Sequence, residues 1–261
     1  MIMHSLEVLH IMEDIEMINQ NYEKLMKMNL TKMAELYKNQ STNKAYLELS
    51  FDERFALLID GEADDKYNKL IYGIQKRSKI RMPEASVSEI RFYPDREIDK
   101  ALTLKLAECE YIDEHLNVIV VGATGAGKTY YISALGNAAC KKAKNVKYIR
   151  LPDLLYDLDQ ARNKESYKKK LKYYARADLL IIDEWLLNPT NAQQQSDILE
   201  LLELRYDCKS TIFASQFLPE GWHANLGGGA VADAILDRVI ANSYLIHIKG
   251  EKSMRTRENK S

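Results

Sequence analysis

The segment from Val118 to Ser133 places a glycine-rich loop between an apolar run and a helix-like stretch. It reads VIVVGATGAGKTYYIS, and its central residues fit the pattern G-x-x-x-x-G-K-[ST]. In that pattern the glycines let the backbone bend, so that successive N–H groups and the start of the next helix bind phosphate oxygens. We therefore predict a nucleotide phosphate loop whose contacts come from Gly122, Ala123, Thr124, Gly125, Ala126, Gly127, Lys128, Thr129 and Tyr130.

Two side chains at the end of this loop carry the chemistry. Lys128 is expected to reach the β- and γ-phosphates, and the Thr129 hydroxyl is expected to bind Mg²⁺. The alternative is a chance glycine-rich turn. The hydrophobic strand before the loop and the helix after it are the context that favours a phosphate site.

A pair of acids ends another apolar run, LLIIDE, 55 residues after Lys128. Asp183 is predicted to hold Mg²⁺ through its water shell, and Glu184 to orient and polarise the attacking water. Two acids could instead simply cap a strand, but their occurrence together with a phosphate loop 55 residues earlier in the sequence favours the catalytic interpretation. The run TIFASQ ends in Ser215 and Gln216, and either could lie beside the γ-phosphate or be an ordinary polar strand end.

Five short apolar runs must position these residues. They span 117–121, 146–150, 178–183, 211–215 and 244–248, with segments of helical length between them. Alternating strands and helices predict an α/β fold with a five-stranded parallel sheet covered on both faces. We assign this domain to residues 111–261.

Residues 1–110 have helical spacing and few β-branched runs, so we predict a small all-helical module there. Ser50-x-x-Glu53 and Ser86-x-x-Glu89 have the capping-box pattern of helix starts, and DREIDKALTLKLAECEYI is predicted to form one further helix. We expect this module to bind DNA, a partner, or both.

Two basic clusters are candidate DNA contacts, although a solvated helix face explains each equally well. The 37 basic and 38 acidic residues nearly cancel, so only local clusters can carry this prediction. No recognition-helix or zinc-finger motif appears, so we expect backbone contacts to duplex DNA without sequence specificity. The clusters comprise Lys76, Arg77, Lys79 and Arg81, and Lys168, Lys169, Lys170 and Lys172.

The three cysteines are far apart and form no CxxC pair, which fits a reducing compartment. The sequence has no apolar run of membrane-spanning length, and its first residues lack the features of a secretory signal. We therefore expect a cytoplasmic protein without membrane partners.

Several motifs together resemble the IstB/DnaC-like AAA+ ATPases, and within them the IstB proteins that accompany a transposase. The resemblance covers about residues 30–255, and residues 1 to about 20 have no match. Its motifs are LSFDERFALLID, VVGATGAGKTYYISALGNAA, ADLLIIDEW, DILELLELRY, STIFASQFLPEGWH, ADAILDRVIANSYLIHIKG and SMR.

The resemblance implies an AAA+ P-loop domain that uses ATP and Mg²⁺. It further implies a homo-oligomer on duplex DNA, with nucleotide at the subunit interfaces, which recruits or activates a transposase. Arg238 matches the family's arginine finger, which reaches the γ-phosphate of a neighbouring subunit. From the residues alone, a surface ion pair is the simpler interpretation of Arg238. Arg255 matches the C-terminal sensor arginine. The ending GEKSMR has one residue more than the family's usual GESMR, so Arg257 is the alternative, and Asp183-Glu184 replaces the family's usual two aspartates.

Other functions fit the sequence less well. A replicative helicase loader shares the fold, but PEGWH and SMR favour the transposition branch. A small-molecule P-loop kinase needs neither Glu184 nor a long helical module. A GTPase would carry an NKxD motif, which NKES at 163–166 does not match, and a vestigial scaffold would not keep Lys128, Thr129 and Asp183.

Overall fold

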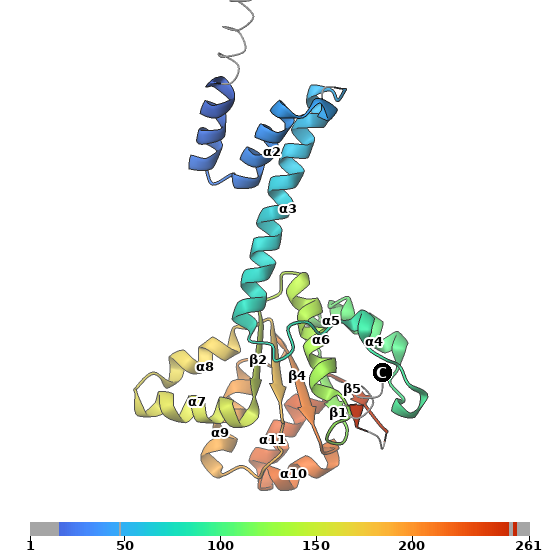
Figure 1. Cartoon of the computed structure of the whole chain (residues 1–261). Helices are drawn as coiled ribbons and strands as arrows, with labels where there is room; N and C mark the ends of the chain where they lie inside the picture. The colour runs from blue at the N-terminus through green and yellow to red at the C-terminus, as the bar shows by residue number, and fades with distance from the viewer. Residues whose placement is uncertain (1–15, 47, 251–252, 255–261) are drawn as a thin grey trace, which may run out of the picture. The chain divides into compact units, whose positions relative to one another are not determined.

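The computed structural model describes residues 16–46, 48–250 and 253–254. The chain divides into two compact units, of which the first ends at Tyr72 and the second begins at Gly73. Each unit is described separately (Figure 1). No helix within the described ranges combines the length and the apolar character needed to cross a membrane.

The first unit is helical, as predicted. Residues 16–27 form a helix, followed by α2 (Thr31–Thr42), the 3-10 turn η1 (Lys44–Tyr46) and α3 (Phe51–Ser78), which continues into the second unit. Ser50 and Glu53 form the predicted reciprocal cap at the start of α3, with the Ser50 N–H donating to Glu53 Oε2 at 2.8 Å. The buried Glu62 accepts from the Met33 N–H at 2.9 Å, which ties α3 to α2.

The second unit contains the predicted five-stranded parallel sheet. Its strands are β1 (Asn117–Val121), β2 (Val146–Arg150), β3 (Leu179–Asp183), β4 (Ser210–Ser215) and β5 (Ser243–His247), each within one residue of its predicted bounds. They lie in the order β2-β3-β4-β1-β5, and every pair is parallel. The carboxyl ends of all five strands therefore meet at one edge of the sheet, where α/β proteins bind their ligands.

Helices cover both faces of this sheet (Figure 1). Alternate strand residues divide between two apolar clusters, with Ile119, Ile182 and Phe213 on one face and Val120, Ile181 and Ile212 on the other. The first face packs against α7 (Leu151–Asn163), α8 (Tyr167–Ala175), α9 (Ala192–Glu203), α10 (Trp222–Asn225) and α11 (Gly229–Ile240). The second packs against α6 (Lys128–Lys141) and the end of α3.

Residues 73–113 belong to the second unit, so the division in the structure differs from the boundary that we placed at residue 110. Apolar side chains of this segment, including Ile74, Ile80 and Leu106, pack in the cluster beneath α6. The chain between α3 and the sheet forms η2 (Val87–Glu89), η3 (Pro94–Arg96), α4 (Lys100–Ala107) and α5 (Glu110–Asp113).

Two of the predicted helices are correspondingly shorter in the structure. The start predicted at Ser86 yields only the single turn η2, since the chain is extended again at Ile90. The helix predicted from 95 to 112 is interrupted at Cys109, whose backbone adopts the left-handed conformation with φ of 66°. That conformation ends the helical hydrogen-bonding pattern, so α4 and α5 are separate helices.

Candidate nucleotide site and basic groove

The predicted phosphate loop connects the end of β1 to the start of α6, at the carboxyl edge of the sheet. Gly125 and Gly127 have φ of 80° and 96°, a conformation that residues with a Cβ rarely adopt. A Cβ on Gly125 would also lie 2.4 Å from Ser253 Oγ, and one on Gly122 would lie 2.4 Å from the Ile248 carbonyl oxygen. The glycines are therefore required both by the turn and by the chain packed against it.

Lys128 and Thr129 open α6 and lie on the loop. Lys128 Nζ donates to the carbonyl oxygens of Gly122 at 2.6 Å and Ala123 at 3.0 Å, so its charge lies over the concave side of the loop. Burial lowers the pKa of Lys128, while the charge of Asp183 opposes that shift. A bound phosphate would favour the charged ammonium group in the same way, because opposite charges stabilise each other.

Asp183 ends β3 next to the loop. Thr129 Oγ1 donates to Asp183 Oδ2 at 2.9 Å, and Tyr148 of β2 donates to the same oxygen at 2.7 Å. Burial, with the charge of Asp183, raises the pKa of Tyr148, so its hydroxyl keeps its proton. The hydroxyl of Thr129 and the carboxylate of Asp183 are hard oxygen ligands of the kind that Mg²⁺ takes alongside nucleotide phosphates, so these residues fit the metal.

Glu184 follows Asp183 at a sharp bend in the chain. Its φ is 55°, and the bend is held by its N–H, which donates to Asp183 Oδ1 at 2.8 Å. The next residue, Trp185, is fully buried, and its N–H donates to the Ala214 carbonyl at 2.8 Å. Buried neighbours on both sides thus fix the backbone of Glu184 while its side chain remains about one quarter exposed.

Gln216 and the C-terminal segment also reach the loop. Thr124 Oγ1 donates to Gln216 Oε1 at 2.8 Å, whereas Ser215 is buried and donates to the Trp185 carbonyl. Gln216 is therefore the strand-end residue whose side chain touches the loop, while Ser215 contacts it through its backbone carbonyl, which accepts from the Gly122 N–H at 3.3 Å. The Met254 N–H donates to the Gly125 carbonyl at 2.9 Å. Arg255 and Arg257, the predicted sensor arginines, lie outside the described residues.

A cavity of about 670 Å³ opens beside the loop. Besides loop residues and Tyr130, it is lined by residues of the segment between α3 and α4, among them Met82, Ile90 and Ile98. The volume and the mixed apolar and polar lining suit a nucleoside. The buried Arg96 of this segment donates to the Ala126 carbonyl at 2.9 Å and to the Lys249 carbonyl at 3.3 Å, and so links three parts of the chain at the loop.

Arg238 lies in α11, near the amino ends of the strands and so at the edge of the sheet opposite the phosphate loop. Asn117, the first residue of β1, donates through its side chain to the Arg238 carbonyl at 3.3 Å. The loop begins after the last residue of β1, four strand steps or roughly 13 Å away. The Arg238 guanidinium is ion-paired with Glu203, donates to the Ala234 carbonyl at 2.7 Å and lies 5.9 Å from the ring centroid of Tyr206. Arg238 and the phosphate loop of one chain are therefore at opposite edges.

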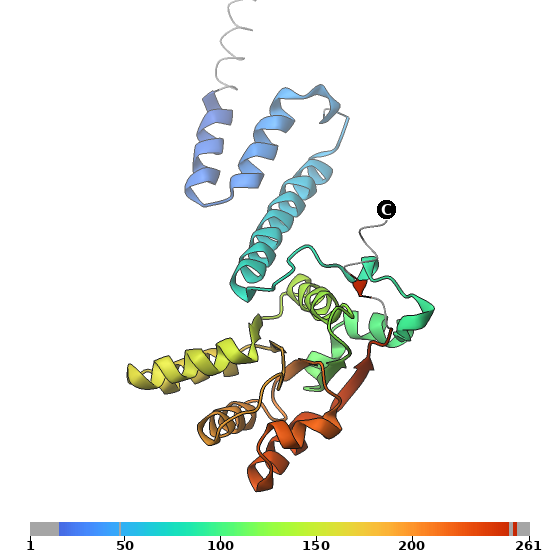
Figure 2. The ribbon, with the colours of Figure 1, turned by 60° about the horizontal axis from the view of Figure 1, so that its bottom comes forward.

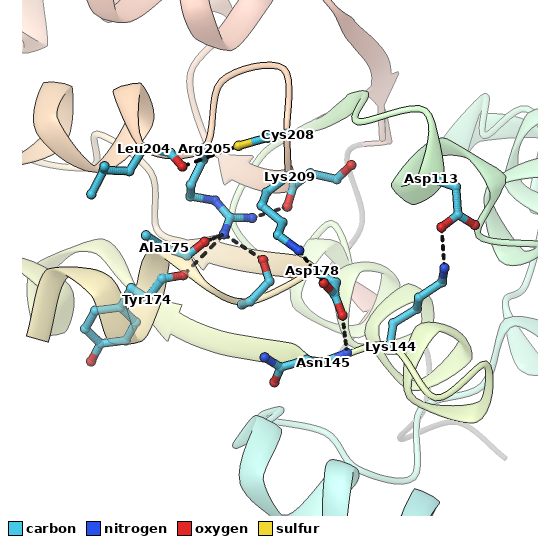
Figure 3. Close-up of polar contacts among 12 residues, drawn as sticks. Asp113, Lys144, Asn145, Tyr174, Ala175, Asp178, Leu204, Arg205, Cys208 and Lys209 are labelled. Carbon is cyan, nitrogen blue, oxygen red and sulfur yellow. Dashed lines mark hydrogen bonds and ion pairs between the residues drawn. The ribbon is translucent and has the colours of Figure 1, made fainter. Parts of the chain in front are cut away.

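The edge that carries Arg238 is held together by the fully buried Arg205 (Figure 3). Its guanidinium donates to the carbonyls of Tyr174, Ala175 and Ala177 at 3.2, 3.0 and 2.8 Å, and also to that of Ser210. Nearby, Lys209 pairs with Asp178 at 2.6 Å. These bonds join the end of α8, the start of β3 and the start of β4 into one fixed platform beside α11.

Half of each predicted basic cluster lines a second cavity of about 790 Å³, which we call the basic groove. Helices α7 and α8 lie side by side along one flank of the sheet (Figures 1 and 2), and the groove lies between α8, β2 and the end of α3. Four residues of the predicted clusters line it, whereas Lys76, Arg77, Lys168 and Lys172 do not. Six basic side chains outnumber two acidic ones, Asp153 and Asp157; the six are Lys79, Arg81, Lys147, Arg150, Lys169 and Lys170.

Sequence reasoning missed Tyr148 and Arg150, which belong to no motif and act through contacts between segments far apart in the chain. It placed Arg96 only near the first basic cluster, whereas the structure buries Arg96 against the loop. Within β2, Tyr148 and Arg150 are separated by one residue and so share a face of the strand, which is the only sequence signal that could have paired them.

The strand order, the phosphate loop and the acid pair at the end of β3 define a P-loop fold of the AAA+ class. The fold resembles that of AMPPCP-bound DnaA from Aquifex aeolicus, with a TM-score of 0.55, 20% identity, and coverage of 68% of this chain and 54% of that chain. It also resembles the DnaC helicase loader, with a TM-score of 0.53, 19% identity, and coverage of 63% and 97%.

The chain belongs to the family of IstB-like ATP-binding proteins, whose model matches residues 23–261. An insertion-sequence ATP-binding protein of Sinorhizobium fredii, y4pL, is 35% identical over 239 residues, which cover 92% of this chain and 97% of that protein. The ATP-binding protein of insertion sequence IS21 from Pseudomonas aeruginosa is 29% identical, over 99% of this chain and 91% of that protein. The resemblance expected from the sequence is confirmed.

Proposed function

We propose that this protein is an Mg²⁺-dependent ATPase that assembles on duplex DNA and recruits or activates a partner transposase. The observation that carries the proposal is the division of its machinery between two edges of the sheet. Lys128, Thr129, Asp183 and Glu184 gather at one edge, and Arg238 lies at the other. A site divided in this way is complete only where two chains meet.

The proposed reaction is hydrolysis of ATP to ADP and phosphate. A water oxygen bonds to the γ-phosphorus, the bond from that phosphorus to the bridging oxygen breaks, and Glu184 accepts a proton from the water. Lys128 and a neighbouring chain's Arg238 stabilise the charge on the transferred group. Gln216, whose side chain contacts Thr124 of the loop, is the proposed polar neighbour of the γ-phosphate. Mg²⁺, held by Thr129 and Asp183, would supply further charge neutralisation. Arg255 or Arg257 is the proposed sensor arginine.

Duplex DNA is the proposed ligand of the basic groove, through phosphate contacts that carry no sequence information. The excess of basic over acidic side chains in the groove supports this assignment. It also favours a DNA-linked ATPase over a small-molecule kinase. Residues 1–110 are the proposed site of further DNA or partner contacts. The partner is proposed to be a transposase because relatives such as y4pL are named as insertion-sequence proteins.

The proposal is tested by measuring ATP hydrolysis with and without duplex DNA, together with the assembly mass by sedimentation velocity. We expect duplex DNA with ATP to raise both the rate and the mass. A monomer that hydrolyses ATP at a rate indifferent to DNA would overturn the proposal. The alternative role, loading of a replicative helicase, is distinguished by pull-down with an insertion-sequence transposase and with a replicative helicase.

A further inference from the structure

Asp183, the proposed metal ligand, is held in place by three hydrogen bonds. Its Oδ2 accepts from Thr129 Oγ1 at 2.9 Å and from the Tyr148 hydroxyl at 2.7 Å, and its Oδ1 accepts from the Glu184 N–H at 2.8 Å. Asp183 is only 3% exposed, so these donors replace much of the water that would otherwise solvate its carboxylate. Of the three donors, Tyr148 alone belongs neither to the phosphate-loop motif nor to the chain next to Asp183.

Tyr148 reaches Asp183 from the neighbouring strand. In the parallel register of β2 and β3, Tyr148 lies beside Ile181, two residues before Asp183. Two residues on one face of a strand are roughly 7 Å apart, so the contact needs a long side chain with a polar atom at its end. The ring of Tyr148 packs against the apolar cluster beneath α6, which limits the movement of the hydroxyl. The ring therefore anchors the side chain, and the hydroxyl holds the carboxylate.

The bonds to Asp183 decide which part of its carboxylate is available to a metal. An ionised carboxylate offers about four lone pairs, two on each oxygen. Thr129 and Tyr148 engage both lone pairs of Oδ2, and the Glu184 N–H engages one of Oδ1. Among the hydrogen bonds of the described residues, one lone pair of Oδ1 is left. This arrangement suits a single hydrogen bond from a water on Mg²⁺, an ion that usually keeps several of its waters.

We propose that Tyr148 is a positioning residue of the Mg²⁺ site, whose hydroxyl holds Asp183 Oδ2 so that Oδ1 is presented to the water shell of the metal. Groups that hydrogen-bond a metal ligand fix its orientation, and their loss typically weakens metal binding by about 10- to 100-fold. The inference rests on the proposed function, since it concerns how the proposed metal ligand of the same ATPase site is held.

The variant Tyr148→Phe tests this role, because it removes the hydroxyl and keeps the ring in the apolar cluster. Calorimetry measures the affinity of the full-length protein for the ATP analogue AMPPCP with saturating Mg²⁺ and with EDTA. By thermodynamic linkage the ratio of these affinities, which we call the Mg²⁺ gain, changes by the same factor as the affinity of the bound complex for the metal.

The Mg²⁺ gain of Tyr148→Phe is expected to fall by roughly five- to tenfold, near the lower end of the range for such groups, because two other donors still hold Asp183. Its affinity for AMPPCP in EDTA should be that of the wild type. A Tyr148→Phe protein whose affinity falls equally in EDTA and in Mg²⁺ has lost structure rather than metal positioning, and that result would overturn the inference.

Tyr174→Phe is the matched control. Tyr174 also lines the basic groove, and its hydroxyl also donates to a carboxylate, that of Asp157, which has no proposed part in metal binding. This variant should keep the wild-type Mg²⁺ gain. An equal fall of the Mg²⁺ gain in both variants would show that the loss of either tyrosine hydroxyl loosens the site, and would overturn the specific role of Tyr148.

The wild-type protein separates failure of this inference from failure of the proposed function. A wild-type affinity for AMPPCP that does not depend on Mg²⁺ would overturn the metal assignment of Thr129 and Asp183, and the inference with it. A clear Mg²⁺ gain in the wild type that Tyr148→Phe retains in full would overturn the inference alone.

Discussion

At the scale of single residues, Lys128 has the most direct link to nucleotide binding. Its ammonium group lies over the loop carbonyls of Gly122 and Ala123, where the phosphates of ATP are expected to bind. A hydrogen bond between two charged groups contributes more than one between neutral groups, because the Coulomb attraction adds to it. The side chain is therefore expected to contribute much of the affinity for the triphosphate.

We predict that Lys128→Ala weakens ATP binding by at least roughly tenfold, and by up to roughly a hundredfold, since charged hydrogen bonds contribute about 1.5–3 kcal/mol. Titration calorimetry with ATP and Mg²⁺ measures the change. Lys142→Ala, just past the other end of α6, is the matched control and should bind like the wild type. Unchanged affinity in Lys128→Ala would contradict the phosphate-loop assignment.

The residues of the loop and the acid pair could be predicted from sequence because each belongs to a contiguous motif next to a strand. The contacts of Glu184 with Arg81 and Arg150 could not, since more than 30 residues separate Glu184 from Arg150 and about 100 separate it from Arg81. Nor does any local pattern indicate that Arg96 is buried against the loop.

At the scale of elements, the strands were the most predictable part of the fold. The central strands β1, β3 and β4 are buried along nearly their whole length, so their runs are short, mainly apolar and contain β-branched side chains. The segment from 79 to 99 was the least predictable. It contains Pro83 and Pro94, forms only single 3-10 turns and takes its shape from contacts with α6 and the loop. Tertiary contacts rather than local propensity decide its conformation.

Arg205 is the residue on which the edge beside α11 most depends. We predict that Arg205→Met lowers the free energy of unfolding by on the order of 3 kcal/mol, because it leaves buried carbonyls of α8, β4 and the chain before β3 without donors. Urea unfolding followed by tryptophan fluorescence reports on this unit, since Trp185 and Trp222 are both in its core.

The control for that measurement is Lys209→Met, four residues along the chain. Its partly exposed pair with Asp178 should contribute about 1 kcal/mol or less. Equal losses in the two variants would show that the buried guanidinium has no special role at this edge.

At the scale of the whole molecule, one chain holds the two halves of the proposed site at opposite edges of its sheet. Arg238 is ion-paired with Glu203 in its own chain and lies roughly 13 Å or more along β1 from the phosphate loop. The proposed function therefore requires a neighbouring chain, and it predicts that DNA that gathers chains together promotes hydrolysis. In this account the nucleotide serves to time assembly.

Mixing two inactive variants tests this central claim most directly. Glu184→Gln should bind ATP and hydrolyse it slowly, and Arg238→Ala should bind ATP normally but also hydrolyse it slowly, because it offers its neighbours no arginine. Glu203→Gln breaks the same ion pair but keeps Arg238, so it should retain activity. That result would show that the loss of activity in Arg238→Ala does not come from the broken ion pair.

The decisive measurement is the rate of ATP hydrolysis on duplex DNA by a mixture of the Glu184→Gln and Arg238→Ala proteins at constant total concentration. In mixed assemblies, an Arg238→Ala chain with an intact Glu184 can receive Arg238 from a Glu184→Gln neighbour. We predict that activity returns in the mixture and peaks near equal proportions. A mixture whose rate stays at the weighted mean of the two variants would contradict a site completed by a second chain.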